Sequence, residues 1–387
     1  MDSAPCGRVF TRLVRKSTQT FEDAFDPRAN AFSFLRFALA LLVIFSHCHP
    51  LGGFGPEPLA AATGGEQTLG LVAVALFFVL SGFLITRSSV QAPSTGRFLW
   101  HRFLRIYPGY WVCLILTALV FAPIICRVEH GSFTALFGIE RNHPLTYITR
   151  NFTLHMRQFT IASLMRSLPY PWIVNGSLWS LSFELVCYFA VAVMGWIGIF
   201  RRARGAVLGM FLLCWGLHLF DLKTPALFHL CLPFFDDGQG LRLFLYFLGG
   251  SVFFLFREKI PCDARIFAAA VIALPLATRC GGFSLVAPIA LPYALLWLAF
   301  TLPLSRFDRW GDFSYGLYIY AFPVQQTLAM FQVHRAGLVA YFLLSTLITL
   351  ALAIASYRLV EAPCLRLKHI VVGRLFSRGS VPIIEAT

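Results

Sequence analysis

The sequence is poor in charge. Of its 387 residues only 13% are Asp, Glu, Lys or Arg, whereas 58% are hydrophobic and 16% are aromatic. Soluble domains typically carry about 25% charged residues, so the composition excludes a soluble globular protein. Together with a mean hydropathy of +0.71, it predicts an all-α, polytopic membrane protein.

Several common sequence signals are also missing. The ten cysteines form no CxxC pair and no zinc-ligand spacing, and most lie inside apolar runs as small packing residues. We therefore predict no metal site. No small-residue cleavage site follows the first apolar run, which is predicted to be a retained helix rather than a removed signal peptide. We find no internal repeat and no low-complexity tract.

Long apolar runs are what the chain does contain. Crossing the hydrocarbon core takes about 20 mostly apolar helical residues. This length predicts about ten transmembrane helices, of which the fifth to seventh are short: 31–49, 68–87, 103–125, 178–199, 206–220, 241–256, 265–279, 284–304, 313–332 and 338–358. Prolines at or near span ends, such as Pro225 and Pro303, agree with these limits.

The basic residues predict the orientation of these helices. If both termini are cytoplasmic, 22 of the 32 Lys and Arg residues lie on the cytoplasmic side, as the positive-inside rule requires. This topology explains the net charge of +14 without nucleic acid as a partner. It divides the chain into a cytoplasmic N-terminal tail (1–30), a transmembrane domain (31–368) with an outer loop at about 126–177, and a cytoplasmic C-terminal tail (369–387).

Two ionisable residues lie near opposite ends of the first span. Arg36 and His47 are eleven residues apart, so both project from roughly one helix face, about 16 Å apart along the axis. Such residues usually face a cavity or a partner. The alternative is that Arg36 reaches lipid headgroups and His47 only ends the helix at the interface.

Glu184 is the carboxylate clearly interior to a predicted span, 178–199. A buried glutamate without a partner becomes protonated, so we expect a neighbouring cation or imidazole. Both Glu184 and His47 are predicted in the outer half of the membrane, where a His–Glu pair is geometrically possible. The alternative is a hydrogen bond that only ties helices together.

A pair of arginines precedes the third span on its cytoplasmic side. Arg102 and Arg105 are spaced i, i+3 and share a helix face. Two guanidinium groups on one face suit a phosphate or pyrophosphate. Ordinary positive-inside anchoring is the alternative for any isolated basic loop.

The chain resembles the acyltransferase-3 family of integral membrane acyltransferases, which acylate, commonly O-acetylate, cell-envelope glycans. The resemblance covers essentially residues 30–368 and rests on six stretches in order: LRFALALLVIFSH (35–47), VALFFVLSGFLITRS (74–88), FLWHRFLRIYPGYW (98–111), SLWSLSFELVCYF (177–189), GDFSYGLYIYAFPVQQ (311–326) and YRLVEAPCLRL (357–367). One departure is that Ala321 and Phe322 precede Pro323, where the family commonly has histidine.

The resemblance implies a donor and an acceptor. Acyl-CoA, with acetyl-CoA expected first, would enter from the cytoplasm, and Arg36, Arg102 and Arg105 would bind its phosphates. His47 would be the general base towards a glycan hydroxyl, and Glu184 would orient its imidazole. An acyl-histidine relay is a chemical alternative. The implied location is the bacterial cytoplasmic (inner) membrane.

Two other classes of protein compete with this interpretation. A transporter of a lipid-linked sugar or small molecule also uses intramembrane Arg, His and Glu. However, the sequence shows no paired halves and no matching broken helices. A receptor or scaffold leaves the interior charges unexplained.

Overall fold

The computed structural model describes residues 19–136, 142–220 and 238–369 of the chain. Within these ranges every regular element is a helix, and the extended backbone forms only an isolated bridge between Thr20 and Pro261. The predicted all-α class is confirmed for this part of the chain. Most of the predicted tails (1–18 and 370–387) and the predicted loop at 221–237 lie outside the described residues.

Each of the ten predicted apolar segments coincides with a helix. The α-helices are α1 (Phe21–Ala24), α2 (Phe32–Gly52), α3 (Pro58–Ala62), α4 (Leu69–Gln91), α5 (Thr95–Leu116) continuing through a π-helix (Thr117–Phe121) into α6 (Ala122–His130), α7 (Pro144–Asn151), α8 (Ser180–Trp196), α9 (Ile199–Arg202), α10 (Arg204–Leu219), α12 (Gln239–Leu255), α13 (Ala264–Arg279), α14 (Phe283–Thr301), α15 (Ser314–Met330), and α16 (Leu338–Ser356) continuing through a second π-helix (Tyr357–Glu361) into α17 (Ala362–Arg366).

The helices form a multi-pass membrane bundle. In the described ranges, six helical stretches are long and apolar enough to cross a bilayer, and α10 and α12 are apolar but shorter. The six are 32–52, 69–91, 95–130, 177–196, 283–301 and 338–366. Exposed leucines such as Leu213 and Leu347 give the bundle an apolar outer surface, which a bilayer accommodates.

Helices α4 and α12 are in backbone contact. A Cβ atom on Gly82 would overlap the backbone oxygen of Phe247, and one on Gly250 would overlap that of Val79. Small residues allow this close approach in membrane bundles. Gly82 faces α12, and the neighbouring Ser81, about 100° around the helix, lines the pocket described below.

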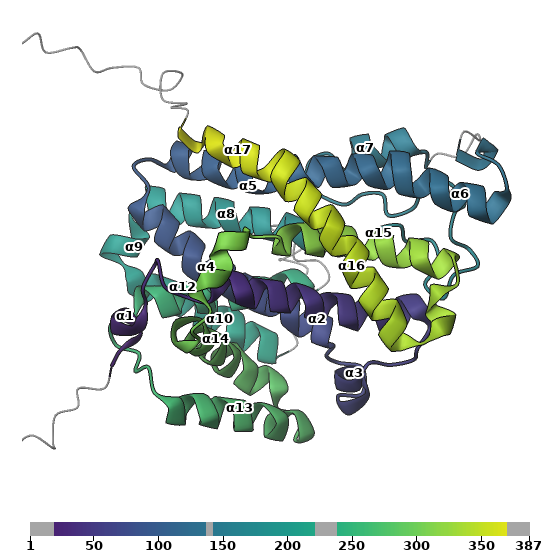
Figure 1. Cartoon of the computed structure of the whole chain (residues 1–387). Helices are drawn as coiled ribbons and strands as arrows, with labels where there is room; N and C mark the ends of the chain where they lie inside the picture. Colours follow the sequence, from purple (N-terminus) through teal and green to yellow (C-terminus); the bar gives the residue numbers. More distant parts are fainter. Residues whose placement is uncertain (1–18, 137–141, 221–237, 370–387) are drawn as a thin grey trace, which may run out of the picture.

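The N-terminal segment packs on the bundle from residue 19 onwards. Phe21 is completely buried, and its ring contacts those of Phe253, Tyr293 and Phe300. Residues 19–30 were predicted as part of a tail, but this aromatic cluster fixes them against α12 and α14. In Figure 1 the first and last helices, α1 and α17, lie towards the same end of the bundle.

An irregular segment leads from α7 back into the interior before α8 begins. Asn151 is fully buried and binds the backbone at both Arg157 and Gln158. Further along, the Asn175 amide donates to the Ile319 carbonyl oxygen of α15 at 2.9 Å. Irregular backbone at membrane depth is stable only when protein surrounds it in this way. Helix α8 therefore starts inside the bundle.

Candidate active site

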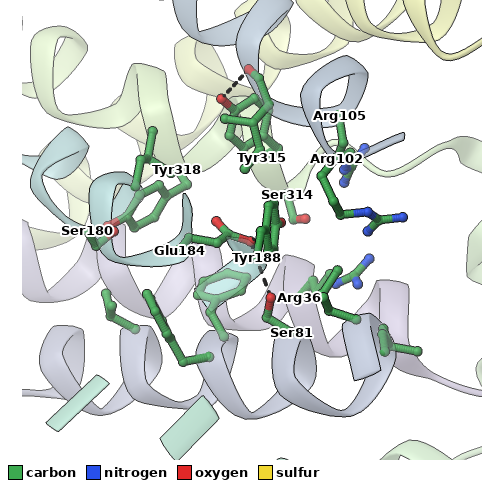
Figure 2. A pocket seen from close by; sticks show the side chains of 17 residues that line it. Arg36, Ser81, Arg102, Arg105, Ser180, Glu184, Tyr188, Ser314, Tyr315 and Tyr318 are labelled. Atoms are coloured by element: carbon green, nitrogen blue, oxygen red, sulfur yellow. Dashed lines mark hydrogen bonds between the residues drawn. The ribbon is translucent and has the colours of Figure 1, made fainter. Parts of the chain in front are cut away.

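A pocket lies among helices α2, α4, α5, α8 and α15 (Figure 2). Its empty volume is about 830 Å³, including the part open to solvent. Apolar side chains make up part of the wall, and the polar lining consists of Arg36, Ser81, Arg102, Arg105, Ser180, Glu184, Tyr188, Ser314, Tyr315 and Tyr318.

The three predicted arginines meet in this pocket. Arg36 comes from the second turn of α2, and Arg102 and Arg105 come from one face of α5. Figure 2 shows the three guanidinium groups on one side of the pocket and Glu184 nearer its centre. Residues far apart in the sequence thus form a single cationic wall.

Asp312 partly neutralises this wall. Its carboxylate accepts a hydrogen bond from Arg36 at 3.0 Å and another from Arg105, and its second oxygen accepts from the hydroxyl of Ser314. Burial by itself raises the pKa of a carboxyl group. Here Arg105, Arg36 and the Ser314 hydrogen bonds outweigh burial and hold the pKa of Asp312 well below its ordinary value.

Arg102 has no acidic partner within the described ranges. Its guanidinium stacks 5.8 Å from the ring centre of Phe98 and 6.0 Å from that of Tyr188. Its Nε atom is buried and has no hydrogen-bond partner in the structure. Buried N–H groups are normally hydrogen-bonded. Arg102 therefore has a free N–H donor for an anionic ligand.

Glu184 is held by neutral hydroxyl groups. Tyr188, one helical turn further on α8, donates to its Oε1 atom at 2.5 Å, and Ser81 of α4 donates at 3.4 Å. The nearest expected cation, Arg102, lines the same pocket without a direct ion pair to Glu184. Glu184 therefore belongs to the arginine pocket.

His47 lies outside this pocket, and the described residues show no contact between His47 and Glu184, whose hydrogen bonds go to Ser81 and Tyr188. Ser46 Oγ is 2.8 Å from the Cβ position of Gly70, so the histidine end of α2 is level with the start of α4. Ser81, the partner of Glu184, is eleven residues further along α4, about 16 Å away. Because α8 begins deep in the bundle, its second turn is level with Arg36 rather than with His47.

The surroundings of His47 are mostly apolar. Its ring packs edge-on against Phe322 at 5.4 Å between centroids, and its buried Nδ1 atom has no hydrogen-bond partner in the described residues. One turn away on α15, the Gln325 amide donates to the Ile44 carbonyl oxygen at 2.9 Å. This hydrogen bond fixes the histidine end of α2 against α15.

Some pocket residues were missed by the sequence reasoning. Asp312 directly precedes the span predicted at 313–332. A carboxylate at the end of a span is a candidate counter-ion for the arginines. Tyr188 stands at i+4 from Glu184, a spacing that puts both on one helix face. No sequence signal linked Ser314 or Tyr318 to the site.

These features define a multi-pass helical membrane protein with a cationic pocket inside its bundle. The acyltransferase domain model of the acyltransferase-3 family matches residues 30–358, which is most of the chain. The chain belongs to this family and is an acyltransferase.

Three curated relatives are similar over nearly their whole length. The O-acetyl transferase of Shigella phage Sf6 is 27% identical over 339 residues, covering 86% of this chain and 95% of its own. Nodulation protein 10 of Rhizobium leguminosarum bv. viciae is 27% identical over 369 residues, covering 90% and 96%. The exopolysaccharide production protein ExoZ of Rhizobium meliloti (strain 1021) is 27% identical over 341 residues, covering 79% and 93%. No solved structure matches this chain.

Proposed function

We propose that this acyltransferase moves an acyl group, in the first place acetyl, from cytoplasmic acyl-CoA to a hydroxyl group of an envelope or exported glycan. The printed names of two relatives, an O-acetyl transferase and an exopolysaccharide production protein, support this class of reaction and acceptor. We place the chain in a bacterial inner membrane with about ten spans and both termini in the cytoplasm.

The observation that carries the donor assignment is the unpaired Arg102 beside Arg36 and Arg105. A coenzyme A donor carries several phosphate groups, and guanidinium groups bind phosphate bidentately. Asp312 offsets part of the charge of Arg36 and Arg105, which leaves Arg102 as the first contact for a phosphate. The pocket residues therefore fit the phosphate end of the donor.

The acyl group then has to travel to the other end of α2. Arg36 and His47 are about 16 Å apart along the helix axis, a distance on the scale of the extended pantetheine arm of coenzyme A. When the donor is bound, it supplies an acyl thioester, a good acyl donor to a hydroxyl group. Arg36 and the α5 arginines would anchor its charged end.

His47 would perform the chemistry. Its imidazole takes the proton of the acceptor hydroxyl while that oxygen bonds to the thioester carbonyl carbon. The carbon–sulfur bond then breaks, and the imidazolium returns the proton to the departing thiolate. An acyl-histidine intermediate is the alternative route. Glu184 is too distant to orient His47 and would instead hold Tyr188 and Arg102 at the donor end.

Membranes containing the wild-type chain or His47→Ala test this proposal. With labelled acetyl-CoA on the cytoplasmic side, envelope glycan should become labelled only with the wild type. Equal labelling by both would overturn the base assignment. Movement of a lipid-linked sugar without acyl transfer would favour the transporter. Glycan analysis of a deletion strain would identify the acceptor.

A further inference from the structure

Trp172 occupies a strained position in the segment before α8. Its φ angle is +70°, and the Ile173 N–H donates to the Pro171 carbonyl oxygen at 2.9 Å across it. This is a classic γ-turn, which is rare and strained, and a bulky residue at positive φ is an outlier. Strain of this kind persists only where the surroundings enforce it, often at ligand sites.

A single buried side chain enforces this turn. Gln326 of α15 is completely buried, and its amide donates to the carbonyl oxygens of both Tyr170 and Ile173 at 2.8 Å. The backbone on both sides of Trp172 is thus hydrogen-bonded to α15, the helix that also carries Phe322. As a result, the indole projects outward and 42% of the residue is exposed.

The turn lies at the His47 end of the bundle. The rings of His47 and Tyr170 both contact the ring of Phe322, at 5.4 and 6.0 Å between centroids. Pro169 packs against Gly53, which ends α2 a few residues after His47. The donor arginines, in contrast, lie near the opposite end of α2. The turn and His47 thus share a contact, Phe322, at the end of α2 away from the arginines.

The exposed groups on the turn suit a sugar ring. Tyr170 is 40% exposed, and the Arg166 guanidinium lies 4.8 Å from the Trp172 ring centre. Rigid aromatic side chains supply contact area at low entropic cost. The C–H face of a pyranose matches an indole face, and its hydroxyl groups match guanidinium N–H donors.

We propose that Tyr170, Trp172 and Arg166 form a binding subsite for a pyranose unit of the acceptor glycan, positioned so that a hydroxyl group of that glycan reaches His47. This subsite rests on the proposed function, because it assumes a glycan acceptor. It adds to that function the residues that select the acceptor, and it assigns Gln326 as the positioning residue of the subsite.

The rival role for Trp172 is an anchor at the membrane surface, where tryptophan is enriched. A matched control is Trp196, the last residue of α8, which is 76% exposed and outside every contact described above. An anchor needs only an exposed indole and no clamped γ-turn, so the two roles predict different responses to substitution.

The test uses full-length protein in proteoliposomes, labelled acetyl-CoA, and polysaccharide extracted from a strain that lacks the gene. Trp172→Gly removes the ring, but it keeps the turn because glycine adopts positive φ freely. We expect Trp172→Gly to raise the KM for polysaccharide about tenfold or more without changing coenzyme A binding. Trp172→Phe, which retains an aromatic face, should lie between Trp172→Gly and the wild type.

Further variants separate the explanations. Gln326→Leu should raise the KM for polysaccharide as Trp172→Gly does, because it releases the turn, while Trp196→Gly should leave it unchanged. Equal KM values for wild type and Trp172→Gly would overturn the subsite, as would an equal rise in Trp196→Gly. If the wild type itself transfers no label to polysaccharide, the proposed function fails rather than the subsite. Binding of coenzyme A by that wild-type protein would show that it is folded.

Discussion

Asp312 and Arg36 are 276 residues apart in the sequence, yet the carboxylate of one lies 3.0 Å from the guanidinium of the other. Asp312 also accepts a hydrogen bond from Arg105. The cationic pocket thus contains its own counter-ion. An incoming phosphate must share these two arginines with Asp312, whereas Arg102 forms no ion pair within the described residues.

Asp312→Asn should strengthen donor binding. The substitution keeps a hydrogen-bond acceptor but removes a negative charge beside the proposed phosphate site, and like charges near a protein surface repel by about 1 kcal/mol or more. We expect coenzyme A to bind several-fold more tightly, measured by isothermal titration calorimetry. Weaker binding would indicate that Asp312 positions the arginines rather than competing with the phosphate.

Asp312 should also make stability depend on acid pH. Because its pKa is lowered in the folded protein, its contribution to stability is complete above the ordinary value near 3.8 and is lost as the pH falls below it. Between pH 6 and pH 3, the Tm of detergent-solubilised wild type should therefore fall more than that of Asp312→Asn. Parallel falls would contradict this linkage.

Arg102→Ala should weaken donor binding the most among the arginine variants. Hydrogen bonds to charged groups contribute about 1.5–3 kcal/mol, so coenzyme A affinity should drop about tenfold to a hundredfold. Arg97 is on the same helix but exposed and outside the pocket, so Arg97→Ala is the matched control. Equal affinities for Arg102→Ala and Arg97→Ala would remove the phosphate role.

His47→Ala should abolish acyl transfer and leave coenzyme A binding intact. The imidazole lies about 16 Å from Arg36 along the helix axis, too far to contribute to phosphate binding. The neighbouring His49 is buried and packs against Phe45, so His49→Ala controls for local disruption. Loss of transfer in His49→Ala with retention in His47→Ala would reverse the assignment.

Glu184 and Tyr188 should behave as one unit. Because a 2.5 Å hydrogen bond joins them, the effects of Glu184→Gln and Tyr188→Phe on donor affinity should be non-additive in a double-mutant cycle. In addition, Glu184→Gln should leave the pH dependence of acyl transfer unchanged, because we assign that pH dependence to His47. A clear shift would restore the His47–Glu184 pair that the structure separates.

Gly82→Ala should destabilise the bundle. The added methyl group meets the backbone oxygen of Phe247, and overpacking costs about 1–3 kcal/mol. Gly209 on α10 has open space around it, so Gly209→Ala should be neutral or slightly stabilising. Thermal unfolding in detergent compares the two. Equal Tm values would mean that α4 and α12 separate at little cost.

The sequence predicted the helices well because their signal is local. Apolar runs such as 68–87 and 338–358 are visible directly in composition, and each lies in a helix of the structure. The spacing of Arg102 and Arg105 likewise fixed them on one helix face. Their meeting with Arg36 followed from the family resemblance and is now seen in the geometry of the pocket.

The sequence did not predict that Glu184 lies in the arginine pocket, because depth was counted from the start of the apolar run. That count assumes that the helix begins at the membrane surface. The segment held by Asn151 and Asn175 instead carries the chain into the interior before α8 begins. Long-range hydrogen bonds of this kind leave no periodic pattern in the sequence.

The sequence by itself determined the class of protein, the positions of its helices and the residue types able to bind a phosphate or transfer a proton, because these depend on composition and on spacing within one helix. Only the tertiary structure decided which of those residues meet. It paired Arg36 with Asp312, placed Glu184 in the pocket of the arginines and brought Tyr170 and His47 into contact with the same ring, that of Phe322. The physical reason is that such contacts depend on how helices and loops pack across hundreds of residues.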